Sequence, residues 1–208
     1  MAFSHLISKI TFPFVIILIL TGTVQADQHL VRSSEFVRSL AQQAIDTLTE
    51  EGISNLVRRK RFRNICRESF AINGIAKFAL GRYWRNTTEN TKTEYLSLFE
   101  DVIVATWADK FSLYSGEKFE IQNALDASIR GRSERTAIVR SIFYLDTRSQ
   151  IRVDWRVSNY EDLYKVTDVT IQGISMSKTT RDEFYSVIRG NAGDINALLK
   201  LLREKRNR

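Results

Sequence analysis

The sequence predicts an α+β fold, in which helices cover one face of a twisted antiparallel β-sheet and leave an apolar cavity between the two layers. Apolar residues follow the helical period up to about residue 114, alternate as in strands from 119 to about 174, and return to the helical period after Met176. Short links between consecutive strands favour antiparallel neighbours. Each strand has one polar face, which indicates a sheet covered on one side only.

Four helices are expected before the sheet. The first runs from Ser33 to Glu51 and ends at Gly52, with an apolar face formed by Phe36, Val37, Leu40, Ala41, Ala44, Ile45 and Leu48. Two shorter helices are predicted next. The first covers Asn55–Ser69, and its inward face carries Phe62, Ile65 and Cys66. The second covers Ile72–Leu80, and its inward face carries Ile72, Ile75, Ala76 and Ala79. A long helix is predicted from about Thr91 to Tyr114.

Four strands and two more helices follow. Phe119 and Ile121 alternate with polar neighbours, and two further segments, 135–145 and 163–174, are rich in β-branched and aromatic residues. The segment 150–158 has the clearest alternation, with one face made of Ile151, Val153, Trp155 and Val157 and the other of Arg152, Asp154 and Arg156. After Met176 one helix contains Phe184 and Ile188, and a last helix carries Ile195, Leu198, Leu199, Leu201 and Leu202.

Residues 1–26 are predicted to be a cleaved secretory signal peptide. After Lys9, eleven largely apolar residues extend from Ile10 to Leu20. That run is too short to span a hydrocarbon core about 30 Å thick. Small residues precede Asp27, as signal peptidase requires. Residues 27–208 are therefore expected to form one exported domain of 208 − 26 = 182 residues, located in the periplasm.

Composition excludes several kinds of site. Cys66 is the only cysteine, so no intrachain disulfide or cysteine zinc cluster can form, and this thiol is expected to be buried. With only two histidines, His5 and His29, most histidine metal sites and catalytic triads are excluded. We expect no metal and no cofactor. The formal net charge of +7 favours an anionic partner without choosing its kind.

Catalytic motifs are mostly absent, so a protein that is not an enzyme is predicted. The sequence has no Gly-x-Ser-x-Gly elbow, no phosphate-binding glycine-rich loop and no His-Glu-x-x-His. Ser175-Met176-Ser177-Lys178 fits the Ser-x-x-Lys pattern, but it falls at a strand-to-helix junction, where Ser177 is more simply a helix cap. A carboxylate pair for glycoside hydrolysis depends on distances in space, so the sequence leaves that alternative open.

A basic cluster in the second helix has two interpretations. Arg58, Arg59, Arg61 and Arg63 either form a solvated helix face or dock the protein to an acidic partner or a lipid headgroup. Nucleic acid is not expected as a partner after export. We predict that these four arginines contribute to partner docking rather than to the stability of the fold.

The apolar stripes also have two interpretations, as ordinary core or as the wall of a ligand cavity. Without the 3 aromatic residues of the signal peptide, 22 − 3 = 19 remain in the predicted mature chain. An exported domain whose main distinguishing feature is an apolar interior is a candidate carrier of apolar ligands. The predicted ligand-binding residues are Trp107, Phe111, Ile151, Val153, Trp155, Val169, Ile171, Phe184 and Ile188.

Several segments resemble, in order, those of the MlaC-type, or toluene-tolerance, family of periplasmic proteins. They are Phe78–Arg85 (FALGRYWR), Phe111–Glu117 (FSLYSGE), Val153–Val157 (VDWRV), Lys165–Met176 (KVTDVTIQGISM) and Arg181–Ile188 (RDEFYSVI). The resemblance extends over the predicted mature chain. It implies a twisted antiparallel sheet with helices, which holds acyl chains in a cavity while the headgroup stays in water.

The same resemblance implies a function and partners. Members of this family shuttle phospholipid between the outer and inner membranes, as the periplasmic component of an ABC-transporter-linked pathway that maintains lipid asymmetry. The implied partners are an inner-membrane ABC transporter complex with an MCE-domain subunit and an outer-membrane lipoprotein complex. Three alternatives stay open: a non-catalytic adaptor without ligand, a carrier of another lipid such as a hopanoid, and a hydrolase.

Overall fold

The computed structural model describes residues 22–108, 110–111, 114, 116–145 and 149–206. Most of the predicted signal peptide lies outside the described residues. The helices are α1 (Gly22–Leu48), α2 (Asn55–Ser69), α3 (Ile72–Leu80), the 3-10 helix η1 (Gly81–Asn86), α4 (Glu89–Ala108), α5 (Met176–Gly190) and α6 (Ile195–Arg206). The strands are β1 (Lys118–Asp126), β2 (Arg135–Tyr144), β3 (Gln150–Tyr160), β4 (Leu163–Ile171) and β5 (Ile174–Ser175).

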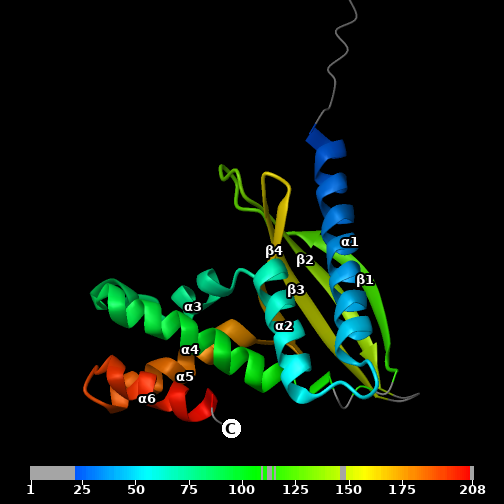
Figure 1. The fold of residues 1–208 in the computed structure, drawn as a ribbon. Coiled ribbons are helices and arrows are strands. Elements are labelled where there is room, and N and C mark those ends of the chain that lie inside the picture. Colours follow the sequence, from blue (N-terminus) through cyan, green and yellow to red (C-terminus); the bar gives the residue numbers. More distant parts are fainter. Residues whose placement is uncertain (1–21, 109, 112–113, 115, 146–148, 207–208) are drawn as a thin grey trace, which may run out of the picture.

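The strands form one antiparallel sheet in the order β1-β2-β3-β4-β5, so each strand pairs with its neighbour in sequence. Figure 1 shows the helices on one face of this sheet. α1 and α2 lie along the sheet, whereas α3 to α6 form a group that contacts it through β4. The predicted α+β class with a one-sided helical layer is therefore confirmed.

Two predicted helices differ from the structure in their bounds, and the first of them also ends earlier, at Leu48 rather than at Glu51. α1 begins at Gly22 rather than at Ser33, because no proline or glycine interrupts the chain after Gly22 and because His29 and Ser33 continue its buried face. α4 ends at Ala108 rather than near Tyr114, and Lys110 and Phe111 form a 3-10 turn. Residues 109, 112–113 and 115 of that region lie outside the described residues.

β3 shows the predicted alternation, and a bulge modifies the neighbouring strand. Val153 and Val157 are buried, and the register between β3 and β4 shifts after Arg156. The extra residue in β4 allows Val166 and Val169, which are three positions apart, to contact the same core. This bulge also places Asp168 at the start of α5, where its carboxylate accepts a hydrogen bond from the Ser177 amide at 3.1 Å.

The core has two parts. The larger cluster joins α1 through α6 to β4 and contains Tyr95 at its centre, where the phenol donates to the Ala76 carbonyl at 2.7 Å. The smaller cluster fastens α1 to the sheet through Val37, Val139 and Val157. Cys66 is buried in the larger cluster, as predicted. The sheet-facing boundary of the larger cluster is where the candidate site lies.

Candidate functional site

An apolar cavity lies between the sheet and the helices. Its volume is about 270 Å³. For comparison, an engineered cavity of about 150 Å³ lined by Leu, Ile and Phe stays dry and binds small apolar molecules. The lining residues come from α2 to α5, the turn after α4 and strands β2 to β4: Phe62, Cys66, Phe70, Ile72, Ile75, Phe99, Ile103, Trp107, Phe111, Phe143, Val153, Trp155, Asp168, Val169, Ile171, Met176, Ser177 and Thr180.

The oxygen-bearing side chains of this wall are already bonded within the protein. The Asp168 carboxylate accepts from the hydroxyl of Ser177 at 2.5 Å and from the hydroxyl of Ser175 at 2.6 Å. The Thr180 hydroxyl donates to the Met176 carbonyl at 2.8 Å. A negative carboxylate at the start of a helix is stabilised by the helix dipole. These groups therefore hold α5 against β4, and the surface that faces the cavity is mainly hydrocarbon.

Trp155 contributes an indole whose polar atom is satisfied inside the sheet. Its Nε1 donates to the Ser141 hydroxyl at 2.9 Å, and that hydroxyl donates to the Val153 carbonyl at 2.8 Å. Buried indole N–H groups generally require such a partner. The chain of two hydrogen bonds fixes the indole across β2 and β3, so the ring can line the cavity without exposing an unpaired donor to an apolar ligand.

Burial also keeps the thiol of the cavity wall neutral. Cys66 is 1% exposed. Burial raises the pKa of its thiol to about 12, with a smaller contribution from the negative charge of Glu100. Only a thiolate is a good nucleophile or metal ligand. At neutral pH Cys66 therefore behaves as a small apolar side chain of the wall.

The structure brings together six of the nine predicted ligand-binding residues. Those that line the cavity are Trp107, Phe111, Val153, Trp155, Val169 and Ile171. Phe184 and Ile188 lie instead in the close-packed core, where the Phe184 ring centroid is 6.2 Å from those of both Tyr95 and Phe99. Only the first two turns of α5 reach the cavity. Ile151 pairs with Phe143 across the sheet and is not part of the wall.

Sequence reasoning missed the wall contributed by α2 and α3. Phe62, Cys66, Ile72 and Ile75 were identified as inward positions of their helices, and the structure places all four on the cavity. Helical periodicity shows which face of a helix is apolar. It does not show whether that face meets packed side chains or a space, because that depends on how far the helix stands from the sheet.

The Ser-x-x-Lys match has a structural explanation. Ser175, not Ser177, is the N-cap of α5, and its hydroxyl accepts from the Lys178 amide at 3.2 Å. The prediction that Ser177 caps the helix is therefore wrong by two residues, because β5 ends at Ser175. Ser177 lies within the first turn, where its hydroxyl donates to Asp168.

The basic cluster has partners within the fold. Arg58 is only 7% exposed, and its Nε donates to the carbonyl of Leu48, the last residue of α1, at 2.9 Å. Arg61 donates to the Thr47 carbonyl at 2.8 Å and also pairs with Glu50. Both arginines thus satisfy carbonyls at the C-terminus of α1, which otherwise lack intrahelical partners.

Arg63, in the same cluster, pairs with two carboxylates of α4, at 2.7 Å from Glu100 and 2.8 Å from Asp101. Arg59 is half-buried. The sequence could not show that Arg58, Arg61 and Arg63 would face carbonyls and carboxylates of the same fold, and these contacts favour a contribution to stability that the sequence did not predict. Whether these arginines also dock a partner stays a prediction.

In the part of the chain that the structure describes, the histidine, cysteine, aspartate and glutamate side chains form no group of three or more that could hold a metal ion. Among the same residues, no helix combines the length and the hydrophobicity that crossing a bilayer requires.

Comparisons with known proteins agree on one family and one fold. The family model described as MlaC protein matches residues 33–204. A solved structure of a phospholipid-binding protein from Ralstonia solanacearum, in complex with a phospholipid, has a TM-score of 0.72 and a sequence identity of 17%. The match covers 84% of this chain and 97% of the other. At this identity, the likeness shows that the two proteins share a fold.

Proposed function

This chain belongs to the MlaC protein family, and from that membership we propose that it is a phospholipid carrier. The observation that carries the proposal is the apolar cavity between α2, α3, α4 and the sheet, in which the polar side chains are bonded to the protein rather than free. The solved relative of the same fold is a phospholipid-binding protein that holds a phospholipid. In this chain, acyl carbons would contact Trp155, Val153 and Val169.

The physical task of a carrier accounts for such a cavity. Two acyl chains contain about 25–30 CH₂ groups, and exposing each to water costs about 0.8 kcal/mol, so an unprotected lipid would cross the aqueous space at a cost above about 20 kcal/mol. A cavity that removes the acyl chains from water lowers that cost. Because its polar side chains are already hydrogen-bonded within the protein, the chains would leave no polar group without a partner. The headgroup would stay in water.

We propose that the carrier works in the periplasm, without catalysis, between the outer and inner membranes. Its partners would be an outer-membrane lipoprotein complex and an inner-membrane ABC transporter complex with an MCE-domain subunit. The sequence contains no phosphate-binding glycine-rich loop for a nucleotide. In this proposal a partner therefore supplies the energy that makes lipid transport directional. The carrier itself exchanges lipid with whichever complex it meets until the two are at equilibrium.

The test is to purify the protein without detergent and to identify bound lipid by native mass spectrometry and organic extraction. We expect phospholipid at up to one molecule per chain. Thr180→Trp would fill the cavity and lower that occupancy, whereas Thr179→Trp, at the exposed neighbouring position of α5, would leave it unchanged.

Other outcomes would identify other functions. A hopanoid in the extract would keep the carrier but change its cargo. Lipid-free protein that nevertheless binds a membrane complex tightly would indicate an adaptor without ligand. Lipid-free protein in repeated preparations, with equal results for both tryptophan variants, would contradict the carrier proposal.

A further inference from the structure

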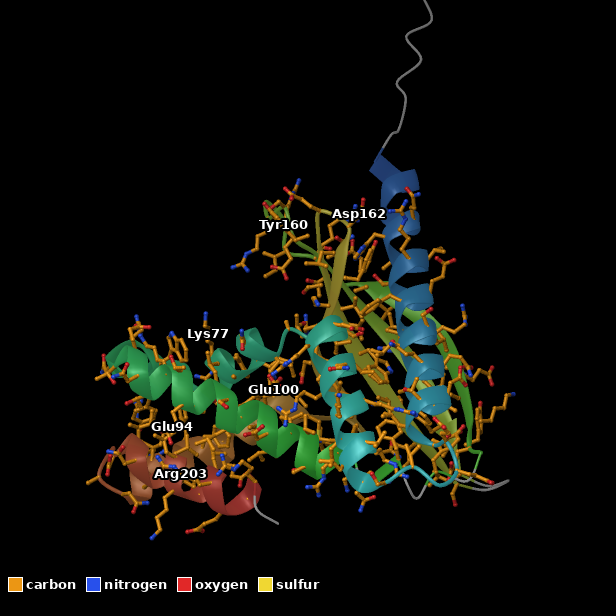
Figure 2. All side chains as sticks on the ribbon, viewed as in Figure 1. Lys77, Glu94, Glu100, Tyr160, Asp162 and Arg203 are labelled. Atoms are coloured by element: carbon orange, nitrogen blue, oxygen red, sulfur yellow. The ribbon has the colours of Figure 1, made fainter. Side chains whose placement is uncertain are left out.

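A second surface of the protein combines cations with aromatic rings. It is formed by α3, η1, the first turn of α4 and the middle of α5, and we call it the cation–aromatic surface. Its five cations are Lys77, Arg82, Arg85, Lys92 and Arg181. Figure 2 labels Lys77 on this part of the helical layer, away from the hairpin tip at which Tyr160 and Asp162 lie. The basic cluster of α2 is a different set of residues.

Two arginines of this surface are held by aromatic side chains. The Arg82 guanidinium lies 5.1 Å from the ring centroid of Tyr83 and 5.7 Å from that of Tyr185. The Arg181 guanidinium lies 5.0 Å from the centroids of both Phe78 and Tyr185. Each guanidinium also donates to a phenol oxygen, Arg82 to Tyr83 at 3.1 Å and Arg181 to Tyr185 at 3.2 Å. The rings and phenol groups position these charges and bring no carboxylate that would cancel them.

Two lysines share the ring of Trp84. The ammonium groups of Lys77 and Lys92 each lie 5.2 Å from its centroid. Together with the arginine contacts, this places four of the five cations against aromatic rings. Such side chains have an apolar body and a charged or polar tip, which suits a boundary between water and hydrocarbon.

The positive charge of this surface is largely uncompensated. Among the residues that the structure describes, Lys77, Arg82, Arg85 and Arg181 make no ion pair with a carboxylate, and only Lys92 has one, with Glu89 at 2.8 Å. Two other exposed arginines are paired: Arg203 with Glu94, whose labels adjoin in Figure 2, and Arg32 with Asp162 at 2.9 Å. The cation–aromatic surface therefore presents four cations without a carboxylate partner among the described residues. The exposed Arg130 and Arg132 also have none there, and the surface differs from those two by its aromatic rings.

This surface also continues the wall of the cavity. Ile75 and Thr180 line the cavity, from α3 and α5 respectively. Phe78, about one turn after Ile75, is 40% exposed, and Arg181, the residue next to Thr180, covers its ring. The apolar wall and the cation–aromatic surface are thus neighbouring parts of the same two helices.

We propose that the cation–aromatic surface docks the protein directly onto a bilayer that contains anionic phospholipids. Unpaired lysines and arginines are attracted to the negative surface potential of such a bilayer, and aromatic side chains settle at its headgroup level. Uncompensated charge alone would suit an acidic protein as well; the exposed Phe78 and the rings beneath the cations favour a lipid surface. The proposal stands whether or not the cavity holds phospholipid.

The test uses the purified chain and two kinds of vesicle, one of phosphatidylcholine alone and one with 30% phosphatidylglycerol. We expect sedimentation with the anionic vesicles only. Arg82→Glu/Arg85→Glu should weaken that binding about tenfold or more, because each removed cation contributes about a fivefold factor at an anionic surface. Raising the salt concentration should weaken binding of the unaltered protein as well, since exposed charges are screened.

The control makes the same change in charge at another place. Arg130 and Arg132 are exposed in the link between β1 and β2, and Arg130→Glu/Arg132→Glu should leave vesicle binding unchanged. Circular dichroism checks that both double variants are folded. Three results would overturn the proposal: no binding of the unaltered protein to anionic vesicles, equal losses in both double variants, or normal vesicle binding by Arg82→Glu/Arg85→Glu together with loss of a protein partner. Lipid extracted from the same preparations reports on the cavity separately.

Discussion

The hydroxyl of Tyr185 occupies the space in which a side chain at Gly81 would have to lie. A Cβ atom built on Gly81 would come within 2.1 Å of the Tyr185 hydroxyl oxygen and 3.0 Å of the ring carbon that carries it. Gly81 also has a φ of +54°, which residues with a Cβ rarely adopt. Because Gly81 has no side chain, the chain can turn out of α3 directly against the Tyr185 ring. There the Tyr185 hydroxyl accepts a hydrogen bond from the Arg82 amide at 3.0 Å.

The first prediction concerns this contact. Gly81→Ala should destabilise the protein by about 2–4 kcal/mol, because it adds backbone strain to a steric overlap. For a domain of this size that corresponds to a loss of roughly 4–16 °C in the melting temperature, which differential scanning calorimetry would measure.

The matched control for Gly81→Ala is Gly74→Ala in α3, the helix that ends directly before Gly81. A Cβ on Gly74 would meet only the Cβ of Ala71, at an ordinary 3.7 Å. There, alanine should stabilise by about 0.4–1 kcal/mol, because it restricts the unfolded chain. Tyr185→Phe removes the oxygen atom and should restore part of the loss in Gly81→Ala. Equal melting temperatures for the two alanine variants would contradict this account.

The second prediction concerns Arg58 at the end of α1. Its guanidinium donates to the Leu48 carbonyl and, at 2.7 Å, to the side chain of Asn55. Arg58→Ala should therefore lower the free energy of unfolding by about 1–3 kcal/mol, because the carbonyl of the buried Leu48 loses a charged donor. Denaturant titration would measure the difference. Lys60→Ala, at an exposed position two residues away, should change stability by less than about 0.5 kcal/mol. A loss as large for Lys60→Ala would show that general charge, not capping, is responsible.

The arginines of α2 also show where sequence reasoning stops. Their helix and its inward residues Phe62 and Cys66 could be predicted, because both follow from apolar periodicity within one segment. The function of Arg58 could not, because its partner is the C-terminus of another helix. A run of basic residues carries no information about which carbonyls or carboxylates the fold brings to it.

The sequence predicts the faces of the strands better than it predicts the wall of the cavity. Alternation in β3 predicts correctly that Val153 and Trp155 share a face, and both line the cavity. Phe184 also follows an apolar period, that of a helix, but lies in the packed core. A cavity is a property of the distance between layers, so an apolar pattern can predict its wall residues only in part.

The third prediction is a loss of stability at alkaline pH. Burial raises the pKa of the Cys66 thiol from its ordinary 9.0 to about 12, and it also raises the pKa of the Tyr95 phenol. The folded state holds both protons more tightly than the unfolded chain does. This contribution to stability is therefore complete below pH 9.0 and is lost as the pH rises towards about 12.

The measurement is the free energy of unfolding in urea between pH 8 and pH 11. Each group can contribute a slope of up to about 1.4 kcal/mol per pH unit above its unfolded pKa. Cys66→Ala removes the thiol and should flatten the curve above about pH 9 while leaving the contribution of Tyr95. If the two proteins have identical slopes, Cys66 does not hold its proton more tightly in the folded state.

The last prediction compares two valines of β3 that lie on the same face. Val153 is 6% exposed and lines the cavity, whereas Val157 is 0% exposed and packs against Val37 and Val139 in the smaller core cluster. An aspartate at either position places a carboxylate in apolar surroundings, and an unpaired buried charge is strongly unfavourable. At Val153 the cavity gives water a way to reach the carboxylate once any ligand has left. At Val157 there is no such space in the described wall.

Val153→Asp should therefore fold and lose bound lipid, whereas Val157→Asp should fail to fold. Circular dichroism measures the folding of each variant, and organic extraction followed by mass spectrometry measures the lipid of each folded one. Val153→Asp that is folded and still loaded would place the lipid away from β3. If both variants unfold, the carboxylate at residue 153 has not been reached by water, and the space beside Val153 does not behave as a ligand cavity. The pair thus separates a carrier from a plain apolar core, because the two substitutions differ only in whether the valine faces a space.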